Sequence, residues 1–218
     1  MRKLFCFMVT IILIVMFALP LAVMGDNVAL TKPVTLYGNF NFQSIPPDYV
    51  PAPASSLVDG VYLEEGNYWA QNTVFWSPYI QGNQGEQYIT IDLLTPYTIT
   101  GFSVQADDND RYLLSYWDSS SSGWLPIWLV PSSYDDPSVG GGMRTRSETL
   151  GSSIVTSMLR FEGVYSEGQV FSDNWFAVSE IQAYGPSTSP VPEPATMLLL
   201  GSGLIGLAGY GRKKFFKK

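Results

Sequence analysis

Two long apolar segments, one near each end of the 218-residue chain, limit how much of the sequence can fold as a domain in water. The first runs from Leu4 to Leu19 behind two basic residues, and small or medium-sized side chains precede Asp26. This order is typical of a secretory signal peptide. We therefore predict a signal peptide over residues 1–25, with an uncleaved signal anchor as the alternative.

The second apolar segment begins after the stretch VPEP and is followed by the basic tail RKKFFKK. At about 1.5 Å per residue, a helix from Ala195 to Tyr210 is roughly 24 Å long, slightly shorter than a hydrocarbon core of about 30 Å. Basic side chains at its end can reach the interface. We predict a transmembrane helix over 195–211 and a basic tail over 212–218 that stays cytoplasmic. An ordinary membrane anchor is the simplest interpretation.

Val-Pro-Glu-Pro, an apolar helix and an Arg/Lys cluster, in this order, resemble the C-terminal sorting signal of PEP-CTERM proteins. The signal would cover 192–218, after a linker over 186–191. The resemblance implies an exosortase-like transpeptidase in the inner membrane of a Gram-negative bacterium. It also implies a body held on the periplasmic side, then passed to the cell surface or extracellular matrix. The residues that carry the signal are Pro192, Glu193, Pro194, Arg212, Lys213 and Lys214.

Charge and composition exclude several functions for the part between the two apolar segments. Residues 26–190 contain five basic and eighteen acidic residues. This balance repels phosphate backbones, so we expect no nucleic-acid partner. The chain has no histidine, and its one cysteine, Cys6, lies in the signal peptide. Ser-His-Asp and Cys-His catalysis, zinc bound by histidine or thiolate, and a disulfide are therefore excluded. Only a pair of carboxylates could then act as acid and base on a glycosidic bond. No acid in the sequence is marked by an apolar surround and a matching partner, so we expect no enzyme.

Alternation with a period of two residues runs through most of the body. In QYITIDL, Ile89, Ile91 and Leu93 alternate with more polar residues, as in a half-buried strand. In TITGFSVQ the phase changes at Gly101, which predicts a bulge. RYLLSYW, SSSSG and WLPIWLV predict a hairpin, and MLRFEGV and FAVSEIQAY predict two late strands. Short strands between turn signals, without a helical stripe, predict an all-β fold, an antiparallel β-sandwich.

Five stretches, in order, resemble the discoidin, or coagulation factor 5/8 type C, module: NVALTKPVTLYG, LVDGVYLEEGNYW, QYITIDLLTPYTITGFSVQ, YLLSYWDSSSSGW and VSEIQAYG. The resemblance covers residues 26–185. It implies a jelly-roll sandwich of the galactose-binding-like type. The chain has neither the disulfide nor the sugar-binding histidine that are common in such modules.

The resemblance also implies a structural calcium ion (Ca2+) beside the Asp-Gly turn at Asp59, with Asn67 and Glu180 as further ligands. The alternative is an Asx turn at Asp59 and a strand-end glutamate that bind no metal. The acidic stretch QADDNDRY predicts instead a solvated turn between two strands, because the glycine and the distant glutamate of a calcium loop do not follow.

Aromatic side chains beside loop signals are candidates for a sugar platform, because pyranose C–H faces stack on aromatic rings. Arginines after a Gly-rich loop could bind hydroxyl or carboxylate groups. The candidate ligand-binding residues are Trp76, Trp124, Arg144, Arg146, Asn174 and Trp175. A place in the core or on a solvated surface is the alternative for each.

The sequence thus predicts an exported, non-catalytic protein that binds carbohydrate, the exopolysaccharide of its own cell. The alternative is a structural envelope or biofilm protein that contacts other proteins and binds no sugar.

Overall fold

The computed structural model describes residues 25–41, 49–77, 86–133, 142–165 and 175–186, together with Ser202. Residues 25–186 form one compact unit. Residues 1–24 of the predicted signal peptide, the Pro-Glu-Pro and basic parts of the sorting signal, and Asn174 lie outside the described residues. Within the described part of the chain, no helix is long and apolar enough to cross a membrane.

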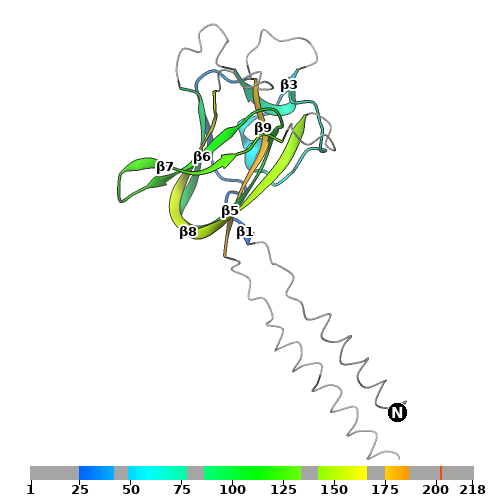
Figure 1. Cartoon of the computed structure of the whole chain (residues 1–218). Coiled ribbons are helices and arrows are strands. Elements are labelled where there is room, and N and C mark those ends of the chain that lie inside the picture. Colours follow the sequence, from blue (N-terminus) through cyan, green and yellow to red (C-terminus); the bar gives the residue numbers. More distant parts are fainter. Residues whose placement is uncertain are drawn as a thin grey trace, which may run out of the picture. The chain divides into compact units, whose positions relative to one another are not determined.

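The described residues fold into strands and one short 3₁₀-helix, which confirms the all-β prediction (Figure 1). In chain order the elements are β1 (Asp26–Asn27), β2 (Val34–Tyr37), β3 (Val50–Pro51), η1 (Ala54–Val58), β4 (Gln71–Trp76), β5 (Tyr88–Asp107), β6 (Tyr112–Asp118), β7 (Gly123–Val130), β8 (Met143–Gly163) and β9 (Phe176–Gly185).

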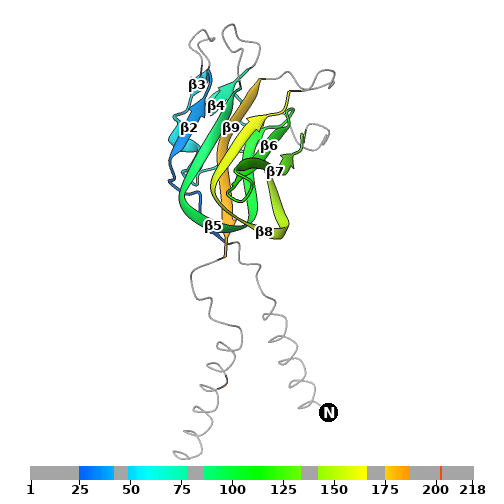
Figure 2. The same cartoon turned by 90° about the vertical axis from the view of Figure 1, so that its left-hand side faces the viewer.

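Two long strands, β5 and β8, run through both layers of the fold (Figures 1 and 2). The first part of β5, from Tyr88, pairs with β2 and with the last part of β8. The second part, from Gly101, pairs with β9 and with the first part of β8. One layer therefore also contains β2, β6 and β7, and the other contains β3, β4 and β9. The result is the predicted antiparallel β-sandwich of the jelly-roll type.

The main core lies between the two layers. The apolar residues of QYITIDL are buried there, as their alternation predicts. A register shift between Ile99 and Gly101 confirms the predicted bulge. Because of this shift, Ile99 and Phe102 both face the core although they lie in opposite phase along the strand.

Candidate functional site

Alternation along β4 and β9 creates a second apolar cluster on the face that points away from the main core. Val74 and Trp76 belong to the main core, whereas Phe75 between them is buried with Met143 and Ala177 in the second cluster. Phe75 and Ala177 pair directly across the two strands. Trp76 is only 2% exposed. Its prediction as a sugar-binding surface residue is therefore wrong, because one position along a strand decides the face.

Four aromatic side chains, which we call the aromatic patch, cover this second cluster: Tyr49, Tyr68, Trp69 and Trp175. The ring centroids of Tyr49 and Trp69 are 5.2 Å apart at 72°, and those of Trp69 and Trp175 are 5.7 Å apart at 52°. Edge-on and tilted contacts of this kind hold rings in fixed positions. Tyr68 is 45% exposed and the other three rings are half-buried. The patch therefore presents aromatic surface to solvent above a packed floor.

Trp175 is the one predicted residue that belongs to the aromatic patch. Trp124 lies in β7 of the other layer, edge-on to Trp117 of β6, at a centroid distance of 5.5 Å. The sequence predictions missed the other three patch residues. The Tyr68-Trp69 pair directly after a Gly-Asn turn was a usable signal, whereas nothing local marked Tyr49.

The loop that leads into the patch is fixed by Asn67. Its side-chain Nδ2 donates a hydrogen bond to the Gln71 carbonyl at 2.8 Å, and its backbone carbonyl accepts one from the Met143 N–H at 2.9 Å. These contacts place Asn67 beneath the aromatic patch. Among the described residues, no hydrogen bond joins it to Asp59 or Glu180.

A polar network beside the patch contains Arg144. The Glu65 carboxylate accepts hydrogen bonds from the backbone N–H and hydroxyl of Thr145, from Gln105 Nε2 and from Arg144 Nη1. Burial alone would raise the pKa of Glu65, but the hydrogen bonds from Thr145, Gln105 and Arg144 outweigh burial and lower it. The predicted residue Arg144 thus lies one position from the patch floor, paired with a carboxylate at 3.4 Å.

Arg146 is buried, so its prediction as a ligand-binding residue does not match its place in the fold. Its Nη1 donates to the carbonyls of Asp107 and Pro131, and its Nη2 donates to that of Asp107, each at 3.1 Å. The guanidinium carbon lies 5.8 Å from the centre of the Tyr112 ring. These contacts join two chain segments to the core.

The acidic turn after β5 is buried, which corrects the prediction of a solvated turn. Asp107, Asp108 and Asp110 have almost no exposed surface. The segment after β7 covers the turn, because Ser132 Oγ and Ser133 N–H both donate to the Asp108 carbonyl at 2.9 Å.

Glu180 of β9 and the Asp59–Gly60 turn lie together. Glu180 is fully buried, and its Oε1 accepts hydrogen bonds from the Gly60 N–H and from Gln182 Nε2, each at 3.1 Å. Burial raises the pKa of Glu180 to about 8, and the nearby Asp59 carboxylate adds to the rise. Asp59 Oδ1 accepts the Val61 N–H at 2.8 Å, which is the Asx turn of the alternative interpretation.

The geometry around Glu180 fits a calcium ion in part. Glu180 Oε2 is buried and has no hydrogen-bond partner among the described residues. A cation there would satisfy that oxygen and offset the repulsion between the Glu180 and Asp59 carboxylates. Asn67 Nδ2 donates to the Gln71 carbonyl, and the described residues contain no group of three or more acidic, histidine or cysteine side chains placed to hold a metal. Calcium therefore stays a proposal for Asp59 and Glu180 alone.

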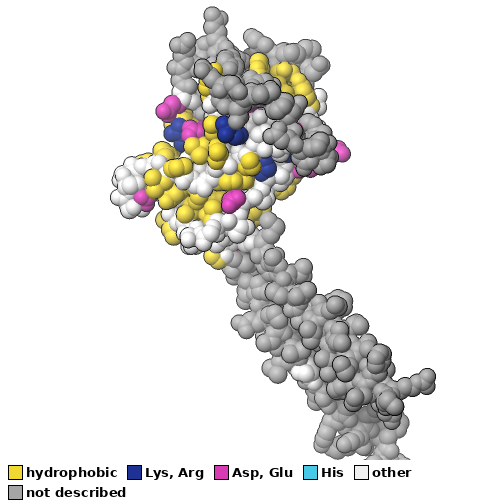
Figure 3. Space-filling view, in the orientation of Figure 1, with side chains coloured by type: hydrophobic (Ala, Val, Ile, Leu, Met, Phe, Trp, Pro, Cys, Tyr) yellow, Lys and Arg dark blue, Asp and Glu magenta, His cyan; other side chains and the backbone are white. Residues whose placement is uncertain are grey.

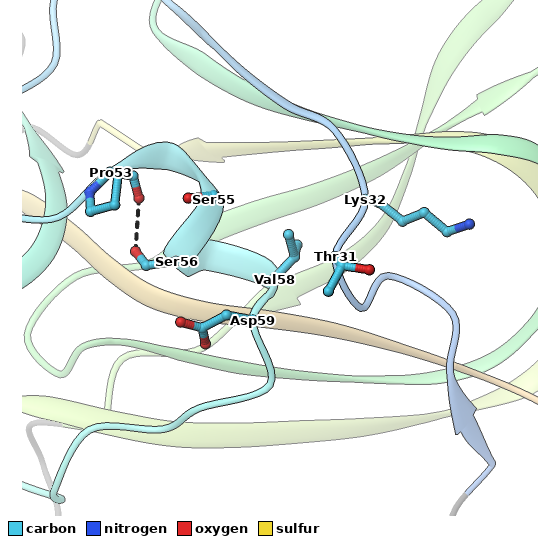
Figure 4. Close-up of a pocket in the computed structure, with 7 residues that line it drawn as sticks. All are labelled: Thr31, Lys32, Pro53, Ser55, Ser56, Val58 and Asp59. Carbon is cyan, nitrogen blue, oxygen red and sulfur yellow. Dashed lines mark hydrogen bonds between the residues drawn. The ribbon is translucent and has the colours of Figure 1, made fainter.

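A pocket of about 300 Å³ lies beside the same turn, between η1 and residues 31–32 (Figure 4). Figure 4 shows the Lys32 and Asp59 side chains pointing away from each other, and the Ser56 hydroxyl donates to the Pro53 carbonyl. The lining residues are Thr31, Lys32, Pro53, Ser55, Ser56, Val58 and Asp59. Because none of them is aromatic, the pocket offers no stacking surface for a sugar ring.

Several solved structures are similar to this chain at low identity. A family 32 carbohydrate-binding module from Streptococcus pneumoniae EndoD is 15% identical, with 73% of this chain and 99% of that chain covered and a TM-score of 0.43. A fucose binding module from the same species, SpX-3, is 14% identical (73% and 97% covered, TM-score 0.47). A Clostridium perfringens module, CpGH89CBM32-4, in complex with GlcNAc-α-1,4-galactose, is 14% identical (74% and 95% covered, TM-score 0.45).

No curated protein matches the chain in sequence. Residues 190–213, however, match the PEP-CTERM protein-sorting motif. The chain therefore carries the sorting signal that its C-terminal sequence predicts.

Proposed function

We propose that the body of this exported protein is a non-catalytic module that binds a neutral polysaccharide at the aromatic patch. The ligand we infer is the exopolysaccharide of its own cell. The observation that carries this proposal is the exposed set of fixed rings above a packed floor, with Trp69 at its centre. Pyranose rings stack their C–H faces on such surfaces, while neighbouring polar groups bind the hydroxyls.

The charges near the patch support a neutral ligand. Arg144 is paired with Glu65, so the polar border has no net positive charge to attract an anionic polymer. The excess of acidic residues in the body also repels uronic or phosphate groups. The Glu65 carboxylate is about half exposed and can accept sugar hydroxyls.

A binding role without catalysis is supported by the place of Glu180. Hydrolysis of a glycosidic bond needs an acid of raised pKa within reach of the leaving oxygen. Glu180 has a raised pKa, but it is fully buried beneath the Asp59–Gly60 turn and cannot reach a sugar on the surface.

The sorting motif supports a form of the protein that is anchored in the inner membrane before it is processed. In this proposal the apolar helix holds the protein in the inner membrane with its body on the periplasmic side. An exosortase-like enzyme then cuts near Pro192–Glu193–Pro194 and passes the body to the cell surface or matrix. The intact mass of the mature protein should lack the residues after this site, whereas a full-length mass would contradict processing.

Two edge strands of the sandwich are poorly suited to the strand addition that a structural envelope protein could use. The edge strands β3 and β7 contain Pro51 and Pro126. Proline has no N–H to donate, so these edges resist the addition of a strand from another molecule.

The test of sugar binding compares exposed tyrosines in the two layers. Tyr68 is 45% exposed in the aromatic patch and Tyr37 is 44% exposed on β2. Tyr68→Ala and Trp175→Ala should each weaken cosedimentation with extracted exopolysaccharide at least tenfold, or about 1.4 kcal/mol. Tyr37→Ala should bind like the parent protein. Equal binding by all three variants would contradict the assignment of the patch, and no binding by the parent would favour the structural alternative.

A further inference from the structure

The two ends of the compact unit lie side by side at one end of the sandwich. Asp26 of β1 pairs with Gly185 at the end of β9, and the Val28 N–H donates to the Ala183 carbonyl at 2.8 Å. Figure 1 shows β1 at the end where β5 and β8 bend from one layer to the other. We call this the terminal end of the sandwich.

Exposed aliphatic side chains lie at the terminal end. Val155 is 63% exposed and Leu94 is 62% exposed. Val155 of β8 pairs with Thr98, and a Cβ added at Gly185 would lie only 2.9 Å from the Thr98 carbonyl oxygen, so these two backbone segments are close together. Leu94 occupies the register irregularity of β5, at a φ of 70° that few leucines adopt. Val155 thus lies near the point where the chain leaves the domain, and Leu94 lies in the part of β5 that connects its two layers.

Aromatic side chains and a lysine border these aliphatic residues. Lys32 Nζ lies 3.5 Å from the Tyr97 hydroxyl and 5.1 Å from the centre of its ring. Tyr97 pairs with Thr156, and the Thr156 hydroxyl donates to the Trp117 carbonyl. Trp117 in turn contacts Trp124. In Figure 3 hydrophobic side chains spread over this face and continue down to the terminal end.

The tether to the sorting signal is short. Residues 186–194 separate the last strand from the predicted membrane helix. At no more than about 3.6 Å per residue, this segment extends at most about 32 Å. Before processing, this reach limits how far the terminal end can lie from the start of the predicted membrane helix.

We propose that, while the protein is anchored, the terminal end rests on the membrane interface through Leu94, Tyr97, Trp117, Trp124 and Val155, with Lys32 at its border. Tryptophan and tyrosine favour the headgroup level of a bilayer, and lysine extends its ammonium to the aqueous side. Asp92 and Asp118 lie in the neighbouring turns, so the contact relies on apolar and aromatic surface rather than on attraction to anionic lipid. The inference depends on the anchor and is independent of sugar binding.

The test uses the full-length chain in lipid nanodiscs of phosphatidylcholine. In a Cys6→Ser background, Val155→Cys and Val50→Cys each carry one environment-sensitive dye. Val50 is a matched control because it is a 47% exposed valine of β3, at the opposite end of the sandwich in both views (Figures 1 and 2). The dye at 155 should shift to shorter wavelength and lose at least half of its emission to lipid-borne quenchers, with little change on adding salt. The dye at 50 should do neither.

Three outcomes would overturn the proposal. Equal responses at the two positions would show that the body is held away from the bilayer. A shift at 155 that depends on protein concentration and persists in detergent would assign the surface to a second copy of the chain. If the dye at 155 still shifted and was still quenched after Leu94→Asp, the apolar surface could not be the cause of that response. Loss of sugar binding in the patch variants leaves each of these results unaffected.

Discussion

Replacing Glu180 by Gln removes a buried carboxyl group and keeps its shape. Gln can still accept the hydrogen bond from Gly60 through Oε1. Burial and the Asp59 carboxylate raise the pKa of Glu180 from 4.5 to about 8. The folded protein therefore keeps a proton that the unfolded chain releases, so the parent loses stability as pH rises between these two values.

Each unit of pKa shift corresponds to about 1.4 kcal/mol, so the parent should lose roughly 3 kcal/mol by neutral pH and up to about 5 kcal/mol by pH 8. Glu180→Gln does not titrate. The difference in unfolding free energy between variant and parent should then grow by about 1.4 kcal/mol per pH unit in favour of the variant. The other acidic residues contribute the same pH dependence to both proteins, so their contribution cancels in this difference. Urea unfolding of residues 26–185, followed by tryptophan fluorescence in the presence of a chelator, measures it.

A difference that stays constant from about pH 5 to pH 8 would refute this reasoning, because it would mean that folding does not oppose ionisation of Glu180. Calcium provides a second readout. If Asp59 and Glu180 hold the ion, added calcium should raise the unfolding temperature of the parent and flatten its pH dependence. It should have little effect on Glu180→Gln. Equal stabilisation of both proteins by calcium would contradict a calcium site at Asp59 and Glu180.

Three further changes test the packing of the sandwich. Trp76→Ala should cost about 3 to 5 kcal/mol of unfolding free energy, because it empties a site in the main core; a cost below about 1 kcal/mol would contradict its burial. Arg146→Met should cost about 2 to 3 kcal/mol in the same assay, because the carbonyls of Asp107 and Pro131 lose their donors; no change would mean that water replaces the guanidinium. Glu65→Gln should lose less stability than the parent in acid, because a lowered pKa gives Glu65 a contribution that is present above its ordinary value and lost as pH falls. Parallel acid unfolding curves would contradict that contribution.

Local patterns predicted the strands of this protein well. The alternation around Ile89 and the change of phase at Gly101 depend on neighbouring residues, and both match the structure. It was harder to predict from the sequence which face of the sheet a single side chain points to. Trp76 stands next to a loop, and only the register of β4 with β9 shows that it points inward while Phe75 points outward.

Contacts between distant segments could not be read from the sequence. Tyr49, Trp69 and Trp175 come from three separate parts of the chain, and the pairing of β3, β4 and β9 brings them together. The burial of the acidic turn likewise depends on Ser132 of a later segment. The turn at Asp59 lies beside the late Glu180, and Asn67 hydrogen-bonds to Gln71; the role of these three residues as calcium ligands stays a prediction.

The position of β9 has a mechanical consequence. Trp175 precedes its first residue in the aromatic patch, and Gly185 ends it at the opposite end of the sandwich. When a polymer held at Trp175 is pulled against an attachment beyond Gly185, the tension runs along the covalent backbone of one strand. Its neighbours β4 and β5 flank that strand on both sides, so under the proposed function the sandwich would bear such a load without its sheets being peeled apart.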